Sequence, residues 1–322
     1  MRMKLRALGT SGILVSPVSM GCWPIAGVTT LHANRDDSLK TLEAALESGI
    51  NFLDTAHAYG VDGESEQMIG EVIRSRRAEV VVASKGGIHR VGRGQDYDAR
   101  PETLRRELEE SLTRLQTDYV DLYYLHAPDP KTPVAESAGQ IADFLRAGKI
   151  RAAGASNLSV TQLEDFHAVC PLSAVQPHFN MLQQEISRDL LPWCRERNIA
   201  VCVYWPLMKG LLAGKLRRDH QFEPGDGRAK YPMFQGEEWQ RNQDFLDELR
   251  TIADRLQITV SQLVIAWTIS RPGITSALCG AKRDWQIRET AAAMHIHLDD
   301  ATLQQIDAAL ARRGPTVSRA AV

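Results

Sequence analysis

The feature that most constrains the fold of this chain is a regular alternation of short apolar runs with longer amphipathic segments. Eight apolar runs of strand length cover residues 18–20, 50–53, 80–84, 122–125, 150–155, 172–176, 199–204 and 275–279. The segments that follow them carry apolar residues at helical spacing, as at Leu104, Leu108 and Leu112. Apolar strands that alternate with amphipathic helices indicate a parallel sheet covered by helices. Eight such units in 322 residues predict an α/β fold of the (β/α)8 TIM barrel type.

Local signals mark the ends of several predicted helices. Pro101 is suited to the first position of a helix, Ser159 to an N-cap, and Gly49 and Gly148 to C-terminal ends. A doubly wound sheet is the alternative fold, and its first strand is usually followed by a glycine-rich phosphate loop. Here the first strand is followed by residues 21–24, Gly-Cys-Trp-Pro, so the barrel is favoured.

Four segments lie outside the predicted barrel repeat. Residues 3–17 predict a β-hairpin that turns through Gly9 and Gly12, and residues 311–322 predict a C-terminal tail. Residues 208–234 form a long, charged connection at the C-terminal face of the barrel, where it could act as a lid. The alternation in residues 294–298 predicts a short strand with His295 and His297 on it. No linker divides the chain, so we expect one domain over residues 1–322.

Composition excludes several classes of protein. The formal net charge is −2, which gives no general attraction for nucleic acid or an anionic membrane. The longest apolar run, residues 199–208, is about half the length of a membrane span. Five cysteines without a CxxC pair, and a start with no signal peptide pattern, indicate reduced thiols and a cytoplasmic protein. Two histidines at 295 and 297 without a third ligand predict no metal site.

Four reactive side chains occur at or just beyond three consecutive strands. Asp54 ends the second apolar run, Tyr59 follows five residues later, Lys85 ends the third and His126 the fourth. In a (β/α)8 barrel these strand ends meet at the face that carries catalytic groups. Asp54 would keep Lys85 protonated, and the ammonium would lower the pKa of the Tyr59 phenol. The set therefore predicts a proton donor for an oxygen that gains negative charge, oriented by His126.

These four residues have other interpretations. Asp54 and Lys85 could form a plain ion pair, and Tyr59 could be surface packing, but four such residues at consistent positions argue against chance. Lys85 could instead form a Schiff base in an aldolase barrel. That function leaves Tyr59, Ser156 and Gln176 without roles, and an ammonium paired with Asp54 is a poor nucleophile.

These motifs resemble those of the aldo-keto reductase superfamily. The similar segments are Asp54-Thr55-Ala56 with Tyr59, Lys85 after a strand, residues 125–129 around His126, and residues 154–157, Gly-Ala-Ser-Asn. The resemblance extends from the N-terminal hairpin to about Leu310. It implies reduction of carbonyls to alcohols with NADP(H), with Tyr59 as general acid, Lys85 and Asp54 as its tuners, and His126 as the substrate-orienting group. We therefore expect NADPH rather than NADH as the cofactor and a small carbonyl compound as the substrate.

The same resemblance implies a set of cofactor-binding residues. Near the nicotinamide these are Cys22, Trp23, Asp54, Ser156, Asn157, Gln176 and Tyr204. A loop over the pyrophosphate would supply Trp205, Pro206, Leu207, Lys209, Gly210, Lys215 and the more distant Arg228. The adenosine phosphate would be held by Gly280, Lys282, Arg283, Gln286, Glu289 and Thr290. Two cations that open a helix suit a 2′-phosphate, whereas an NAD site tends to carry an acid for the ribose.

The substrate pocket is expected beside the nicotinamide, lined by Trp23, His57, His126 and Trp205. Two residues depart from the family pattern: Thr290 stands where many members have Asn, and Trp205 where many have Ser. A subunit that binds NADP as a redox sensor with little turnover is the main alternative function. The sequence leaves the oligomeric state and the physiological substrate open.

Overall fold

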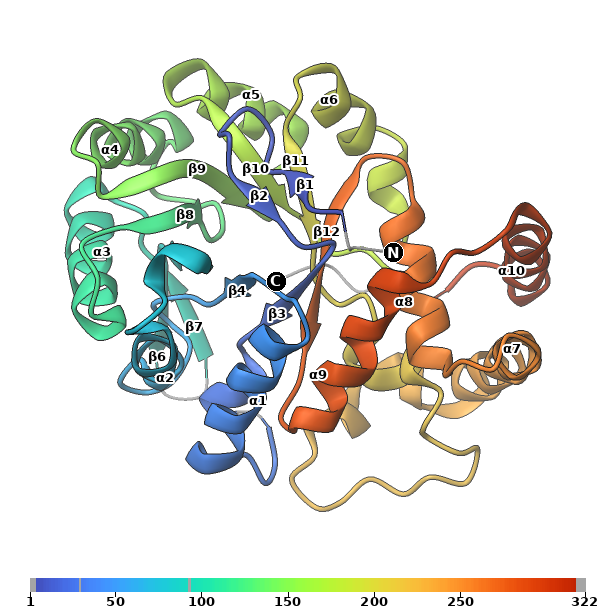
Figure 1. The fold of residues 1–322 in the computed structure, drawn as a ribbon. Coiled ribbons are helices and arrows are strands. Elements are labelled where there is room, and N and C mark those ends of the chain that lie inside the picture. The colour runs from blue at the N-terminus through green and yellow to red at the C-terminus, as the bar shows by residue number, and fades with distance from the viewer. Residues whose placement is uncertain (1–3, 29, 92–93, 317–322) are drawn as a thin grey trace.

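The computed structural model describes residues 4–28, 30–91 and 94–316, so the first residue of the predicted hairpin and residues 317–322 of the predicted tail lie outside it. Eight parallel strands close into a barrel (Figure 1). In order around the barrel they are β3 (Val18–Gly21), β4 (Phe52–Asp54), β5 (Val81–Gly86), β8 (Val120–Leu125), β9 (Ile150–Ser156), β10 (Leu172–Gln176), β11 (Ala200–Val203) and β12 (Ile274–Gly280). All eight predicted strands are present, with ends that differ by at most two residues. The predicted TIM barrel is confirmed.

Eight helices surround the strands (Figure 1). They are α1 (Arg35–Glu47), α2 (Glu64–Ile73), α3 (Pro101–Leu115), α4 (Val134–Arg146), α5 (Val160–Val169), α6 (Leu190–Glu196), α8 (Val260–Ser270) and α9 (Asp284–Ala291). Pro101 occupies the start of α3, where its missing N–H leaves no helical hydrogen bond unmade. Ser159 caps α5 in a reciprocal arrangement with Gln162, as the sequence predicted.

Two further helices lie outside this ring. α7 (Gly236–Arg255) and α10 (Asp300–Arg313) lie side by side at one flank of the barrel (Figure 1). Arg313 at the end of α10 is buried, and its Nη2 donates to Asn242 Oδ1 on α7 at 2.7 Å. The sequence analysis did not predict α10, and it placed the start of the tail inside this helix.

The N-terminal hairpin closes the bottom of the barrel. Strands β1 (Arg6–Ala7) and β2 (Leu14–Val15) pair antiparallel, and Leu8, Ile13 and Val15 pack with the side chains of the barrel interior. Gly9 in the turn has φ +58°, and a Cβ there would lie 2.3 Å from Ser173 O. Only glycine fits this contact, which fixes the hairpin against the start of β10.

Two parts of the chain differ from the sequence prediction. After β5 the chain forms an antiparallel pair, β6 (Ile88–Val91) with β7 (Gly94–Tyr97), which was not predicted. The predicted strand at 294–298 is wrong, because the 3-10 helix Ala292–His295 covers its first part. A strand needs a neighbour for its backbone hydrogen bonds, and a closed barrel has no free edge to offer one.

The long connection between β11 and α7 runs over the C-terminal face and contains three 3-10 segments, Met208–Ala213, Gly227–Lys230 and Pro232–Phe234. All five cysteines are described; each is buried, and none is in a disulfide. Over the described ranges, the helices are too short or too polar for any of them to cross a membrane.

Candidate active site

The four reactive side chains of the sequence analysis meet at the C-terminal mouth of the barrel. Asp54 ends β4, Lys85 lies in β5 next to its last residue, His126 follows β8, and Tyr59 lies on the loop between β4 and α2. Lys85 Nζ lies 2.6 Å from Asp54 Oδ1 and 3.5 Å from the Tyr59 hydroxyl. The Tyr59 and His126 rings are 6.0 Å apart, centre to centre. We call these residues the tetrad.

Lys85 is fully buried and has three oxygen neighbours. Besides Asp54 and Tyr59, its ammonium donates to Thr55 O at 2.7 Å. Burial is the largest single influence and lowers the pKa of Lys85, but the charges and hydrogen bonds of Asp54 and Tyr59 together outweigh it, so the net pKa is raised. The amine therefore stays protonated at neutral pH, which disfavours its use as a Schiff-base nucleophile.

The phenol of Tyr59 differs from the prediction in one respect. Burial raises its pKa, and the charge of Lys85 offsets only part of that rise. The predicted lowering of the Tyr59 pKa is therefore wrong in net direction, because desolvation of a phenolate outweighs one nearby cation. At neutral pH the hydroxyl is protonated and held beside an ammonium, which suits a group that gives up its proton only in a transition state.

His126 is a neutral imidazole at this site. Burial and the positive charge of Lys85 hold its pKa well below the ordinary value. Its Nδ1 is buried and has no hydrogen-bond partner among the described residues. A neutral imidazole has one nitrogen that can donate and one that can accept a hydrogen bond, so this ring beside Tyr59 can make one to a bound molecule.

A set of amide and hydroxyl groups lies on the next strand ends. Gln176 Nε2 donates to Asp54 Oδ2 at 2.7 Å, and Ser156 Oγ donates to Gln176 O at 2.8 Å. Asn157 Oδ1 accepts from the Tyr204 hydroxyl at 2.8 Å. Asn157 itself has φ 62°, a left-handed conformation that asparagine tolerates better than most residues. Asn157 Nδ2 also donates to His126 O and to Ser156 Oγ, so these four residues join the tetrad in one hydrogen-bonded network.

The segment after β11 has an unusual backbone. Trp205, Met208, Lys209 and Gly210 all have positive φ. The Trp205 ring packs edge-on against Tyr204 at 5.6 Å, and Lys209 Nζ lies 4.2 Å from its centre. Non-glycine residues in this conformation are strained, and such strain is concentrated at binding sites. Pro206 and Leu207 lie within the same turn.

Several predicted phosphate-binding cations already have partners. Lys215 pairs with Glu289 on α9, and its Nζ lies 4.3 Å from the centre of the Trp285 ring. Arg228 makes a forked contact with the carboxylate of Asp226, its Nη2 lying 2.7 Å from Oδ2. These two cations would reach a phosphate only by leaving or sharing those carboxylates.

The opposite end of the predicted cofactor groove lies at the start of α9. Lys282 Nζ donates to Leu31 O at 2.9 Å, and Arg283 Nη2 donates to His32 O at 3.0 Å. Gln286 Oε1 accepts from the backbone N–H of Lys282 at 2.9 Å, and Thr290, a buried residue of α9, donates from Oγ1 to Gln286 O at 3.2 Å. Gly280 abuts Pro24, since a Cβ there would lie 2.9 Å from Pro24 Cγ. Lys282 therefore bonds to a carbonyl that a phosphate oxygen can replace, whereas Arg283 also pairs with the carboxylate of Asp37, its Nη1 lying 3.2 Å from Oδ2.

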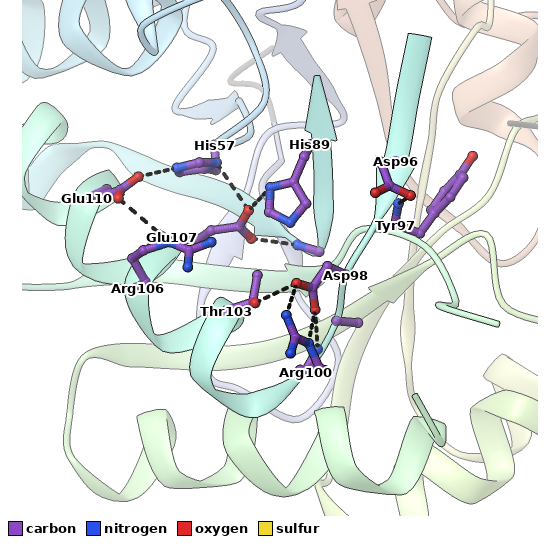
Figure 2. Close-up of polar contacts among 12 residues, drawn as sticks. His57, His89, Asp96, Tyr97, Asp98, Arg100, Thr103, Arg106, Glu107 and Glu110 are labelled. Carbon is purple, nitrogen blue, oxygen red and sulfur yellow. Dashed lines mark hydrogen bonds and ion pairs between the residues drawn. The ribbon is translucent and has the colours of Figure 1, made fainter. Parts of the chain in front are cut away.

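The residues of the predicted substrate pocket separate into two groups. Trp23 packs edge-on against Tyr59 at 5.0 Å, and Cys22 is buried behind it, so these residues lie with the tetrad. His57 does not: its ring lies between Glu107 and Glu110 of α3 (Figure 2). Its place in the substrate pocket stays a prediction, and the structure shows that two carboxylates of α3 hold its ring.

Sequence reasoning missed Glu107, which lies beneath this part of the site. A usable signal existed: Glu107 falls on the apolar face of α3, three residues after Leu104 and one before Leu108. A carboxylate at such a position is rarely buried without a partner.

The arrangement fits an extended dinucleotide. The side-chain amides of Asn157 and Gln176 and the ring of Tyr204 lie beside the tetrad. The backbone with positive φ, within residues 205–210, follows β11, and two cations, Lys282 and Arg283, immediately precede α9. Helix N-termini and paired cations bind phosphate.

The chain belongs to the aldo/keto reductase family, whose model matches residues 17–311. It is 35% identical to the NADH-specific methylglyoxal reductase of Escherichia coli over 315 residues, which is 93% of this chain and 96% of that protein. Its fold is similar to that of the glycerol dehydrogenase of Gluconobacter oxydans, with a TM-score of 0.90 and 33% identity, covering 99% and 98% of the two chains. An aldo/keto reductase of Klebsiella pneumoniae in complex with NADP and acetate matches with a TM-score of 0.74 and 27% identity, covering 97% and 96%.

Proposed function

We propose that this protein reduces a small aldehyde or ketone to an alcohol with NADPH, with Tyr59 as the general acid. The observation that carries the proposal is the position of the Lys85 ammonium, 2.6 Å from Asp54 Oδ1 and 3.5 Å from the Tyr59 hydroxyl. A buried phenol beside a protonated lysine is suited to protonating an oxygen that becomes an alkoxide.

Each residue of the tetrad has a distinct part in this proposal. Tyr59 transfers its proton to the substrate oxygen as negative charge builds on that atom. Lys85 stabilises the phenolate that remains, and Asp54 keeps Lys85 charged and in place. His126, as a neutral ring, hydrogen-bonds the same oxygen and orients the carbonyl. The bound cofactor supplies the hydride.

The residues that would hold the cofactor are those described above. Ser156, Asn157 and Gln176 can bond a carboxamide, and Tyr204 can pack on the nicotinamide ring. Lys282 and Arg283 can bind the phosphate that distinguishes NADPH from NADH, which favours NADPH. The Klebsiella pneumoniae relative was solved with NADP, whereas the Escherichia coli relative is named NADH-specific. The proposed preference for NADPH over NADH therefore rests on Lys282 and Arg283.

The names of two relatives suggest where to look for a substrate. Methylglyoxal and glycerol are both three-carbon oxygenated compounds. We infer that small polar carbonyls of this size are the substrates to test before bulky hydrophobic ketones.

The test is a carbonyl panel followed by the absorbance of reduced nicotinamide, with NADPH and NADH side by side. We expect turnover of at least one small aldehyde, and faster turnover with NADPH. The Tyr59→Phe variant should lose nearly all activity, by roughly 100-fold or more, because general acid catalysis contributes about 10²–10⁴-fold. Its affinity for NADPH, measured by quenching of tryptophan emission, should stay close to that of the wild type.

Two results would count against the proposal. A Tyr59→Phe variant with half of the wild-type activity would remove Tyr59 from the role of general acid. Tight NADPH binding without turnover of any carbonyl would favour a redox-sensing subunit instead.

A further inference from the structure

A buried carboxylate lies beneath the loop that carries Tyr59. Glu107 of α3 is fully buried. Figure 2 shows its carboxylate beside His57 and His89. Its Oε2 accepts the backbone N–H of Gly87 at 2.7 Å. Its Oε1 lies 2.9 Å from His89 Nδ1 and 3.4 Å from His57 Nδ1. One carboxylate therefore contacts three segments: the Tyr59 loop, the end of β5 and the β6–β7 hairpin.

The His57 contacts hold the Tyr59 loop at several points. Its ring lies between two acids, since Nε2 is 2.6 Å from Glu110 Oε2. Its backbone N–H donates to Lys85 O at 3.0 Å, and its backbone O accepts from Arg114 Nη1 at 3.2 Å. His57 is two residues before Tyr59, so these bonds limit how far the loop can move the phenol.

Two histidine rings and one backbone N–H lie at the carboxylate oxygens of Glu107. A buried carboxylate is costly unless cations and hydrogen bonds compensate it. The close contact with Glu107 is the main cause of the raised pKa of His89. The hydrogen bond to His57 is likewise the main cause of the lowered pKa of Glu110.

The remaining charged groups that face the two histidines come from neighbouring elements. Arg106 and Arg114 lie on α3, Glu66 lies on α2, and Asp98 follows β7. Asp98 favours the charged form of His89, and Arg106 opposes it. At His89 the effect of Glu107 and Asp98 on the pKa therefore outweighs the opposing effect of Arg106.

We propose that Glu107 is a positioning residue for the general acid, holding Tyr59 and Lys85 at their working separation. It acts on Lys85 through Gly87, two residues further along the chain, and on Tyr59 through His57. This role rests on the proposed function and extends it to a residue that meets neither substrate nor cofactor in that proposal.

The first experiment compares Glu107→Gln with Glu109→Gln. Glu109 lies on the same helix but is exposed and pairs with Lys149, so it is a matched control. We expect Glu107→Gln to lower kcat roughly 10- to 100-fold, since a misplacement of about 1 Å can cost about 100-fold. KM and the dissociation constant of NADPH should stay within about twofold, because the cofactor groups lie on other strands. Glu109→Gln should match the wild type in all three quantities.

Amide hydrogen exchange supplies a readout that does not need turnover. Peptides that contain residues 55–63 and 85–89 should exchange faster in Glu107→Gln than in Glu109→Gln. If Glu107→Gln fails to fold, His57→Gln tests the contact between Glu107 and the Tyr59 loop by itself. This variant should lower kcat and should speed exchange only in residues 55–63.

The outcomes separate this inference from the proposed function. Unchanged kcat and unchanged exchange in a folded Glu107→Gln or His57→Gln variant would overturn the positioning role. A wild type that reduces no carbonyl would overturn the proposed function alone, and exchange would then decide whether Glu107 orders the two segments.

Discussion

Removal of the charge of Asp54 tests the electrostatic centre of this site. The Asp54→Asn substitution keeps the shape of the side chain but leaves the Lys85 ammonium buried without its counter-ion. Loss of one partner of a buried ion pair destabilises a protein by about 3–5 kcal/mol. This loss of stability has an upper limit, because Lys85 can lose its proton and remain buried as a neutral amine. Deprotonating a lysine of ordinary pKa about 10.4 at pH 7 costs about 4.6 kcal/mol, at about 1.36 kcal/mol per pKa unit.

The corresponding change in melting temperature follows from the size of the chain. An unfolding entropy of about 2.1 cal/mol/K per residue gives about 0.7 kcal/mol/K for 322 residues. A loss of about 3 to 4.6 kcal/mol then lowers Tm by about 4 to 7 °C. At pH 9 the upper limit falls to about 1.9 kcal/mol, so the effect of the substitution should shrink as the pH rises.

The assay is thermal unfolding followed by circular dichroism at pH 7 and pH 9. The double variant Asp54→Asn with Lys85→Met removes both charges and should be more stable than the sum of the single effects predicts. A Tm change below about 1 °C for Asp54→Asn at pH 7, or strictly additive single effects, would refute the reasoning.

Two further predictions concern acid stability and cofactor choice. Asp129 is buried, and its hydrogen bonds from Lys131, Thr132 and Ala99 outweigh burial and lower its pKa. Its contribution is therefore present above the unfolded pKa of about 3.9 and is lost as the pH falls towards the folded value. Asp129→Asn should cost about 1–3 kcal/mol at pH 7 and less at pH 3.5, measured by thermal unfolding; an equal cost at both pH values would contradict this. Lys282→Ala should weaken NADPH binding about tenfold, or about 1.4 kcal/mol, and NADH binding by less than about twofold, measured by tryptophan quenching. Equal losses for the two cofactors would remove Lys282 from the 2′-phosphate site.

Much of the fold was accessible from the sequence because its signals are local. The strands are mostly apolar, since a parallel sheet is covered on both faces, and the helices have one apolar stripe. The strand ends that carry Asp54, Lys85 and His126 follow from that pattern once the barrel is inferred. The β6–β7 pair and α10 were missed because polar surface residues and a flanking helix give weaker patterns than a buried strand.

The Tyr59 pKa was beyond the sequence for a different reason. Its direction depends on how much water the folded loop excludes, and a residue list gives the neighbouring cation but not the degree of burial. The sequence therefore supplied the sign of the Lys85 effect and missed the larger effect of desolvation.

By itself, the order of residues determined the barrel and the strand ends at which the tetrad residues stand. Only the tertiary structure decided that Glu107 meets His57 and His89, that Lys215 and Arg228 pair with carboxylates, and that the Tyr59 pKa rises. The physical reason is the separation along the chain over which each effect acts. Periodicity and capping act within a few residues along the chain, whereas ion pairs and desolvation depend on which distant segments lie within a few ångströms in space.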